Sequence, residues 1–474
     1  MNQMEYFLRN MVGIPRVLIV VLFALETIVV SGLAMEVTVI REEVIDPAIP
    51  AFGNGSSPSW NFGSPMIVRQ GQDVWFSLSR PVEGVPPYAN TIWQIYRWHE
   101  GGWEVILESP GPMDREPCPL VRLNAYTLAV FINPKVSFRS FRAENEAILW
   151  NSHPHLLAFP SAMEKPETFT LHPVFSGAPV QREHTYRGIA VNPENSEVLV
   201  FVQDPDSELY HPSYLDPEGV WHGLSEFTFP IRGLYASLFI RDREAHVVAV
   251  SDIVEPVPEW RDAKYEVLQR RHDYAFRHIY YAWSPNVLKE GFGEGLVIDS
   301  VVDRPGHMRN LDLLVDADGA AHILYLKKRF QYGFLRDQFF PGEPLEVSIS
   351  YAQVRDGKVV ARHDLIEGNM ESEGSDDHDR LEPTWGRLHQ LPDGRLIAIV
   401  SADRENGRVM WALELDTSGR PGRPIEIPLQ QPLGAVFFTN TARGGSPPSN
   451  TIDLLEMTWG AEHHEIRYAE VEIR

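Results

Sequence analysis

A hairpin-like unit recurs seven times along the chain, and this repetition limits the possible folds more than any other feature. Each copy joins a short apolar strand, a turn containing Asp, Asn or Gly, and a second run of mostly apolar, β-branched residues. A polar turn between two half-apolar runs of strand length predicts antiparallel pairing. The copies occupy residues 67–78, 121–132, 190–202, 239–250, 314–326, 388–400 and 442–457.

A second strand element, with aromatic residues and a charged turn, follows most of these hairpins, for example at residues 92–106, 279–291 and 349–362. Two hairpins make a four-stranded antiparallel sheet, and a spacing of about 50 to 75 residues is typical of propeller blades that carry loop insertions. The sequence therefore predicts an all-β fold, a seven-bladed β-propeller of four-stranded antiparallel blades. Two stacked β-sandwich domains are the alternative.

The two ends of the repeated region complement each other. Residues 35–41 (MEVTVIR) form a strand before the first unit, and the last strand, which ends at Arg474, lacks a second hairpin partner. Pairing these two strands closes the ring and removes exposed sheet edges. No Gly/Ser-rich or Pro-rich linker of ten or more residues interrupts the chain, so we expect residues 35–474 to form one propeller domain.

Residues 1–34 have the features of a secretory signal peptide. Arg9 and Arg16 precede an apolar run that ends in small residues, which predicts cleavage after Ala34 and a secreted or periplasmic protein. The run is close to the length that spans a bilayer, so an uncleaved membrane anchor is the alternative. After cleavage we expect no contact with a membrane.

Acidic residues dominate the charge, with 65 Asp and Glu against 42 Lys and Arg and a formal net charge of −23. An extended nucleic-acid interface needs a basic surface, so nucleic acid is excluded as a partner. Cys118 is the one cysteine, so no intramolecular disulfide can form, and we expect a buried and inert thiol. We expect the protein to be a monomer.

Six of the seven units carry an arginine near the start of their first strand, where propeller strands converge on a central channel. The planar guanidinium suits bidentate binding of a carboxylate or sulfate, so converging arginines predict an anionic ligand. The predicted substrate-binding residues are Arg115, Glu116, Glu183, Arg309, Asn310, Glu382, Arg387 and Arg443. Alternatively, some of these arginines are structural and pair with nearby glutamates. The pairs would be Arg115–Glu116, Arg187–Glu183 and Arg387–Glu382.

The segment EHTYRG, residues 183–188, combines the most reactive side chains of the sequence. In an extended strand His184 and Tyr186 share one face, because successive side chains alternate. Together with Arg187 they would supply a base, a phenolic acid and a charge neutraliser, the set needed to abstract a proton alpha to a carboxylate. We therefore predict these three as catalytic residues for β-elimination at a uronic acid, with a structural role for His184 as the alternative. A second polar group, residues 271–274 (RHDY), is a candidate for the channel mouth.

Two further motifs carry weaker signals. SDDHDR, residues 375–380, has no paired ligand spacing and is more typical of a solvated acidic loop than of a metal site. We predict no cofactor and leave a structural divalent cation open. SYLDPEGVW, residues 213–221, approaches the Asp-box turn of sialidase-type propellers, although its Gly-to-Trp spacing is one residue short.

Five segments together resemble a family of secreted bacterial BNR-type propeller proteins. They are residues 53–65, 115–120, 183–188, 250–256 and 339–344. More distantly, the seven-bladed plan with a His/Tyr/Arg cluster is similar to ulvan lyases, secreted propellers that cleave a sulfated, uronate-containing polysaccharide. By that resemblance His184 or Tyr186 would take the proton and Arg187 would neutralise the carboxylate. The His-Asn run usual in those lyases is absent here.

Sialidases provide a second comparison, because they use three arginines, a Tyr–Glu pair and an acidic residue. Arg115, Arg309 and Arg443 would imitate the three arginines, and Glu382 would imitate an acidic residue. The sequence thus predicts a secreted, carbohydrate-active protein that cleaves an acidic polysaccharide by β-elimination. A sialidase-like glycoside hydrolase and a non-catalytic glycan- or protein-binding propeller are the alternatives.

Overall fold

The computed structural model describes residues 35–85, 89–138, 150–177, 187–204, 207–270, 274–370, 381–434, 436–458 and 463–474. The predicted signal peptide, its cleavage site and the alternative of a membrane anchor lie outside these residues. Residues 35–474 form one unit of the chain.

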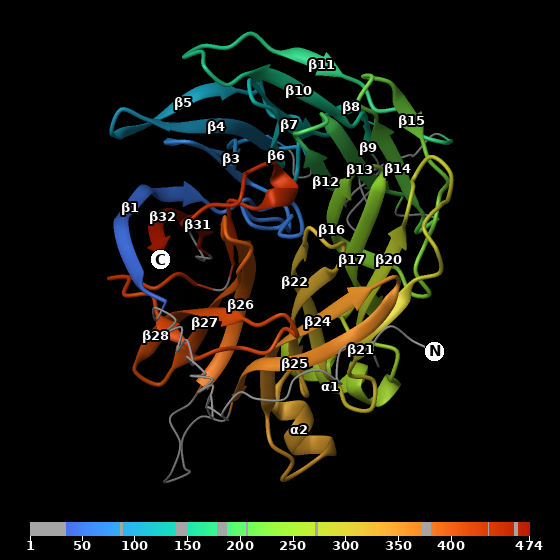
Figure 1. The fold of residues 1–474 in the computed structure, drawn as a ribbon. Helices are drawn as coiled ribbons and strands as arrows, with labels where there is room; N and C mark the ends of the chain where they lie inside the picture. The colour runs from blue at the N-terminus through green and yellow to red at the C-terminus, as the bar shows by residue number, and fades with distance from the viewer. Residues whose placement is uncertain are drawn as a thin grey trace, which may run out of the picture. The chain divides into compact units, whose positions relative to one another are not determined.

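Almost all of this unit is antiparallel sheet, and the sheets follow one another around a ring in chain order (Figure 1). The first sheet contains β2 (Ile67–Gln70), β3 (Asp73–Pro81), β4 (Thr91–His99) and β5 (Gly102–Glu108). The second contains β6 (Leu120–Asn124), β7 (Thr127–Ile132), β10 (His155–Pro160) and β11 (Phe169–Leu171). The third contains β12 (Arg187–Asn192), β13 (Glu197–Gln203), β14 (Tyr210–Leu215) and β15 (Trp221–Gly223). The fourth contains β16 (Gly233–Arg241), β17 (Glu244–Ser251), β20 (His278–Ser284) and β21 (Leu296–Ser300).

The next eight strands belong to one sheet. They are β22 (His307–Val315), β23 (Ala321–Lys328), β24 (Glu346–Arg355), β25 (Lys358–Asn369), β26 (Leu381–Gln390), β27 (Leu396–Arg404), β28 (Gly407–Leu415) and β29 (Ile425–Glu426). A single residue pair, Asn369 with Leu381, connects β25 to β26 and so joins two four-strand halves. The prediction of seven separate four-stranded blades is therefore corrected to five four-stranded sheets and one sheet of eight strands in the described residues.

The last four-stranded sheet closes the ring. Its order is β1 (Val37–Pro50), β32 (His463–Ile473), β31 (Thr451–Met457) and β30 (Phe437–Thr439). Val37 lies opposite Ile473, and the predicted pairing of the N-terminal strand with the final strand is confirmed. Because β1 is the outermost strand of a sheet otherwise made by the C-terminal end, the two ends of the described unit hold each other in place.

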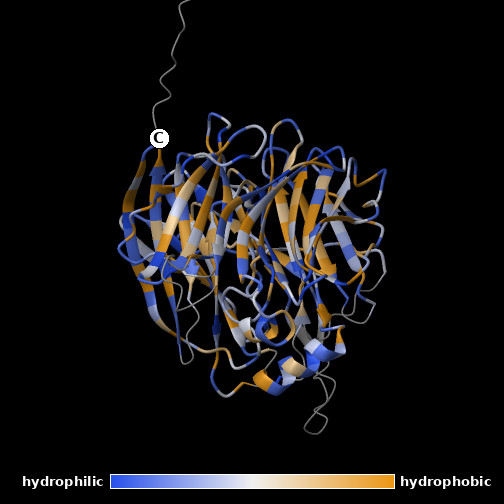
Figure 2. Cartoon of the chain, turned by 90° about the horizontal axis from the view of Figure 1, so that it is seen from below, coloured by the Kyte–Doolittle hydropathy of each residue, from blue (hydrophilic) through white to orange (hydrophobic). Residues whose placement is uncertain are grey.

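The first strand of each sheet or half-sheet contacts the next around a closed cycle. The order is β2, β6, β12, β16, β22, β26, β30 and again β2. Such a cycle identifies a propeller and excludes two stacked sandwiches. Strands near the centre, such as β12 and β13, are buried along their whole length, whereas the outer strand β25 alternates exposed with less exposed residues. The apolar residues of the strands accordingly form the buried core, and Figure 2 shows that hydrophobic residues concentrate along the strands.

Loop insertions carry the remaining elements. The helix-like spacing noted within residues 256–277 corresponds to α1 (Pro258–Leu268), and residues 329–344 contain α2 (Gly333–Phe339). Two two-stranded sheets pair β8 (Lys135–Phe138) with β9 (Trp150–Ser152) and β18 (Ile253–Val254) with β19 (Tyr274–Ala275), and a 3-10 turn, η1, spans Ala442–Gly444. No helix of the described chain is long and apolar enough to cross a bilayer.

Candidate functional site

The centre of the ring is occupied by the chain itself. Residues 52–66, here called the central segment, are mostly buried and connect β1 to β2. Arginines from different sides of the ring donate to its backbone. Arg115 Nε lies 3.1 Å from the carbonyl of Asn54, Arg387 2.9 Å from that of Phe62, and Arg443 2.6 Å from that of Gly63. Three of the arginines singled out in the sequence thus bind this segment.

Arg387 and Arg443 are fully occupied by protein groups. Arg387 also donates to the carbonyls of Leu311 and Phe437 at 2.6 and 2.9 Å. Arg443 forms an ion pair with Asp312 at 2.9 Å, and both guanidinium groups are almost completely buried. This geometry supports a structural role for the two arginines more than a contact with substrate. The acid that pairs with Arg443 is Asp312, however, and not one of the glutamates considered in the sequence.

Arg187 is also enclosed. Its guanidinium donates to the carbonyl of Pro117 at 2.9 Å and to the sulfur of Cys118 at 3.2 Å, and it lies 3.5 Å from Asp114. The side chain is inaccessible to solvent, which leaves no room for a substrate carboxylate. The burial expected for Cys118 is confirmed. Three residues predicted next to Arg187, namely Glu183, His184 and Tyr186, lie outside the described residues, as do residues 271–273.

Arg309, in contrast, has a guanidinium that no acid neutralises within the described chain. It is half-buried between two aromatic rings, 5.6 Å from the centroid of Phe62 and 5.6 Å from that of Trp385. Its Nε is buried and makes no hydrogen bond to a described residue. Burial lowers the pKa of Arg309, yet the group stays charged at neutral pH. A buried cation without a counterion favours the arrival of an anion.

Tyr235, near the start of β16, is the aromatic centre of this region. Its ring stacks on Phe62 with centroids 4.4 Å apart, and its carbonyl accepts a 2.7 Å hydrogen bond from the buried Asn310 side chain. Burial raises the pKa of Tyr235, so the phenol is protonated at neutral pH. The charged groups that act on the phenol are Asp252, Glu116, Arg309 and Arg115. The predicted residues Arg115, Glu116 and Arg309 are therefore brought together around a tyrosine that the sequence analysis missed.

His307 lies two residues before Arg309 on β22, so both side chains point to the same face of the strand. Its ring is 5.3 Å from that of Phe276, which in turn is 6.2 Å from Tyr235. Burial, followed by the positive charges of Arg309, Lys328, Lys264 and Arg277, holds the pKa of His307 well below its usual value. Its Nδ1 is buried and makes no hydrogen bond within the described chain. A neutral imidazole with a free ring nitrogen can accept a proton.

The cations around His307 have acidic partners. Lys328 binds Glu382 at 2.8 Å, while Lys264 and Arg277 share Glu255 at 3.2 and 2.6 Å. Glu382 therefore pairs with a lysine and not with Arg387. Arg115 lies 3.9 Å from Glu116, as the structural alternative expected. We name Tyr235, His307 and Arg309 the inner-strand site.

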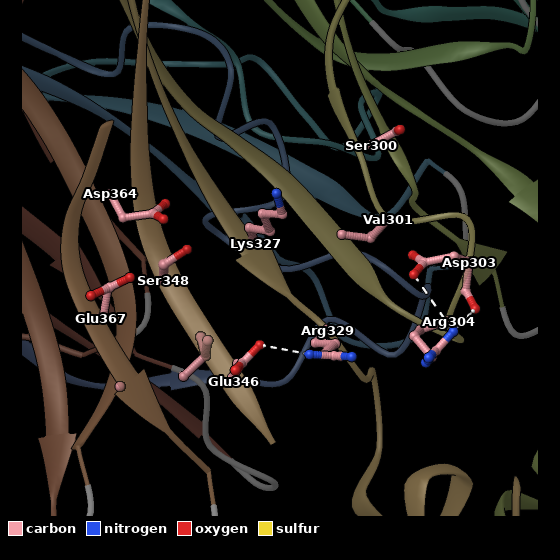
Figure 3. Close-up of a pocket in the computed structure, with 12 residues that line it drawn as sticks. Ser300, Val301, Asp303, Arg304, Lys327, Arg329, Glu346, Ser348, Asp364 and Glu367 are labelled. Atoms are coloured by element: carbon pink, nitrogen blue, oxygen red, sulfur yellow. Dashed lines mark hydrogen bonds and ion pairs between the residues drawn. The ribbon is translucent and has the colours of Figure 1, made fainter. Parts of the chain in front are cut away.

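A cavity with a volume of about 540 Å³ lies near the ends of β21, β23, β24 and β25 (Figure 3). Its basic residues face carboxylates: Arg329 binds Glu346 at 3.1 Å, and Arg304 binds Glu343 at 2.9 Å. Lys327, which also lines the cavity, binds Asp299 at 2.8 Å. A carboxylate already neutralises each of these cations. The cavity should therefore attract an anionic ligand less strongly than Arg309 does.

A histidine cluster lies at the side of the second sheet. The rings of His153, His155 and His172 have centroids 5.6 to 6.2 Å apart, and His155 Nδ1 lies 2.7 Å from the carbonyl of His153. Burial lowers the pKa of His155. Among the described residues no group of three or more His, Cys, Asp or Glu is placed to hold a metal ion, and the acidic run 375–380 lies outside them.

Sequence reasoning missed Tyr235 and His307 for a physical reason. It ranked the arginines by their position in the repeat, which does not distinguish an arginine bound to backbone carbonyls from one between aromatic rings. A usable signal was the spacing of His307 and Arg309, which are two residues apart shortly before the predicted unit at residues 314–326 and would share one face of an extended strand.

Comparison with known proteins agrees with this fold. No protein-family model matches the chain, and no curated protein sequence matches it. A solved structure of the polysaccharide lyase Uly1 is similar, with a TM-score of 0.51 and 9% identity, over 92% of this chain and 99% of that one. An α-L-arabinanase from Penicillium chrysogenum with arabinobiose has a TM-score of 0.43 and 10% identity, over 91% and 98% of the two chains. The sialidase of Trypanosoma rangeli with sialic acid has a TM-score of 0.40 and 9% identity, over 80% and 58%. At this identity the likeness to the lyase shows a shared propeller fold.

Proposed function

We propose that this protein is a carbohydrate-active propeller that binds an acidic glycan at the inner-strand site and cleaves it by β-elimination. The observation that carries the proposal is the Arg309 guanidinium, half-buried between Phe62 and Trp385 without a carboxylate partner in the described chain. A uronate carboxylate or a sulfate group would neutralise the charge of the guanidinium and accept its hydrogen bonds.

The neighbouring groups have the protonation states that elimination requires. Arg309 would neutralise the uronate carboxylate and so acidify the adjacent C–H. The neutral His307 would take that proton while the carbon–carbon double bond forms, and the protonated phenol of Tyr235 would protonate the departing glycosidic oxygen. The bond to that oxygen breaks in the same step, so the products are an unsaturated uronate end and a new hydroxyl.

His184 and Tyr186 remain alternative proton-transfer residues, since they directly precede the described Arg187 in the sequence. A sialidase-like hydrolase and a non-catalytic binding module remain the competing functions. The similarity of fold to a polysaccharide lyase supports the lyase first.

We further propose that the ring has seven blades, because the strand ladder between the two halves of the eight-stranded sheet consists of one residue pair. A secreted or periplasmic location, reached by cleavage after Ala34, belongs to the same proposal. An acidic polysaccharide outside the cell would be accessible to such a protein.

The proposal is tested with the full chain, incubated with polyuronates and with sulfated, uronate-containing glycans while the absorbance of unsaturated products is followed. We expect the absorbance to rise with the unmodified protein and to remain flat with Arg309→Ala, His307→Gln and Tyr235→Phe. Arg420→Ala, which changes an exposed turn residue, is the matched control and should retain full activity. Thermal unfolding of each variant establishes that it is folded.

The other outcomes decide between the alternatives. Loss of activity in His184→Ala and Tyr186→Phe, with His307→Gln active, would move proton transfer to residues 184–186. New reducing ends without the absorbance would indicate hydrolysis, and binding without turnover would indicate a recognition module. If Arg309→Ala binds acidic glycans as tightly as the unmodified protein, the inner-strand site is not the binding site.

A further inference from the structure

A second polar cavity lies at the opposite ends of the strands from the inner-strand site. Its volume is about 270 Å³, and it is lined by Glu244, His246, Tyr281, Trp283, Asp318, Gly319, Arg355 and Asp356. Glu244 begins β17, and Asp318 and Asp356 belong to the turns after β22 and β24, whereas His307 and Arg309 begin β22. The two sites are therefore on opposite faces of the ring.

The inner wall of this cavity is a fixed hydrogen-bonded network. The Trp283 indole donates to Glu244 at 2.9 Å, and the two ring nitrogens of His246 lie 3.3 Å from Glu244 and 2.7 Å from the hydroxyl of Tyr281. Hydrogen bonding to His246 lowers the pKa of Glu244, and burial lowers that of His246. At neutral pH the wall thus presents an ionised carboxylate and a neutral imidazole beside a half-buried indole.

The same acid–His–Tyr arrangement recurs on the next strands, where it is closed. His322 lies 3.1 Å from Asp316 and 2.7 Å from the hydroxyl of Tyr351. There the turn between β28 and β29 packs tightly onto the tyrosine. A Cβ on Gly419, in this turn, would lie 1.8 Å from the Tyr351 ring.

At the cavity the corresponding turn lies between β24 and β25, and it does not close the space: a Cβ on Gly357 would lie 3.8 Å from the Trp283 ring, an ordinary contact distance. The turn between β22 and β23 leaves the cavity open as well, because a Cβ on Gly319 would have no nearer neighbour than the Glu244 carboxylate at 4.0 Å. The cavity is therefore a local departure from the repeat and not a consequence of it.

We propose that this cavity binds one non-acidic sugar residue of a glycan, as a second, non-catalytic site. Three carboxylates, those of Glu244, Asp318 and Asp356, offer acceptors for sugar hydroxyls, and Arg355 offers donors. Trp283 supplies an apolar surface for the ring. The excess of carboxylates repels uronate and sulfate groups, and the volume, just below the usual range for drug-sized ligands, fits a single sugar ring.

This inference rests on the proposed glycan-related function but uses different residues, so the two can fail separately. The experiment titrates the full chain with neutral xylo-, gluco- and arabino-oligosaccharides and follows binding by calorimetry and by tryptophan fluorescence. We expect Trp283→Ala and Asp318→Asn to weaken the binding at least about tenfold. Trp221→Ala, on an outer strand of another sheet, and Asp262→Asn, on α1, are the matched controls and should bind normally.

Variants of the two sites should have separable effects. Arg309→Ala should leave neutral-sugar binding unchanged, and Trp283→Ala should leave the binding of short acidic oligosaccharides unchanged. Absence of neutral-sugar binding by the unmodified protein, or equal binding by Trp283→Ala, would overturn the inference. Tighter binding of an alkylammonium ion than of any sugar would also overturn it, because the carboxylates and the indole would then be an ammonium site.

Discussion

Arg443 and Asp312 form an ion pair at 2.9 Å in the middle of the ring, and both side chains are almost completely buried. Asp312 also accepts the backbone N–H groups of Leu313 and Leu388 at 3.0 Å. One carboxylate therefore links β22, β26 and the 3-10 turn to which Arg443 belongs.

Asp312→Asn should destabilise the protein by about 3–5 kcal/mol, because it leaves the buried Arg443 charge without its counterion. Urea unfolding followed by intrinsic fluorescence measures the loss. Glu472→Gln is the control, since Glu472 binds the solvent-exposed Arg474 at a similar distance, 2.8 Å. An unchanged unfolding midpoint in Asp312→Asn would mean that the pair has no structural role.

Arg309→Lys separates the charge of Arg309 from its shape. Lysine keeps the positive charge but lacks the flat guanidinium that lies between Phe62 and Trp385. We expect acidic-glycan binding to weaken by about 0.5–2 kcal/mol, the range of one cation–π contact, with little change in thermal stability. Calorimetric titration measures the affinity, and Arg420→Lys serves as the exposed control. Equal affinities would show that the charge alone attracts the ligand.

The repeat pattern made the fold predictable, because alternating hairpins with turn residues specify strands and their order. It also located the ring closure, since two unpaired strands at the ends of the chain have one obvious partner each. The number of separate sheets was less accessible, because it depends on one residue pair, Asn369 with Leu381, that continues the ladder between two halves. No composition or spacing signals a single backbone contact of this kind.

The site was harder to predict for a different reason. Periodicity shows that arginines converge on the centre, but it does not show that the chain fills that centre with the central segment. Arg387 and Arg443 then bind carbonyls of Phe62 and Gly63, whereas Arg309 meets aromatic rings. The difference arises from tertiary contacts between segments more than 200 residues apart.

Glu456 should make stability depend on pH. Burial raises the pKa of this carboxyl from 4.5 to about 6, against the hydrogen bond from Gly434 N–H and the charges of Arg467 and Arg408. Between pH 4.5 and 6 the folded protein holds a proton that the unfolded chain has released, so stability falls as the pH rises through this window. The shift of about 1.5 pKa units corresponds to about 2 kcal/mol.

Urea unfolding at a series of pH values measures this effect, with Glu456→Gln as the comparison. The stability that the protonated Glu456 carboxyl contributes is fully present below pH 4.5 and lost above pH 6. The Glu456→Gln variant should therefore lack this part of the pH dependence of the free energy of unfolding. If the free energy of unfolding of Glu456→Gln changes with pH as steeply as that of the unmodified protein between these pH values, the raised pKa of Glu456 is contradicted.

Gly419→Ala tests the tight closure that distinguishes the second acid–His–Tyr network from the open cavity. The new methyl group would lie 1.8 Å from the ring of Tyr351, and the φ of Gly419 is +80°. We expect a loss of about 1–3 kcal/mol from overpacking in addition to about 1–2 kcal/mol from the left-handed backbone. Gly394→Ala is the matched control, because its φ is +90° and no atom lies within 4 Å of the added Cβ. It should therefore lose only the backbone contribution in urea unfolding. Equal losses in the two variants would mean that the turn does not press on Tyr351, and that closure by this turn does not explain why one network is sealed while the other opens onto a cavity.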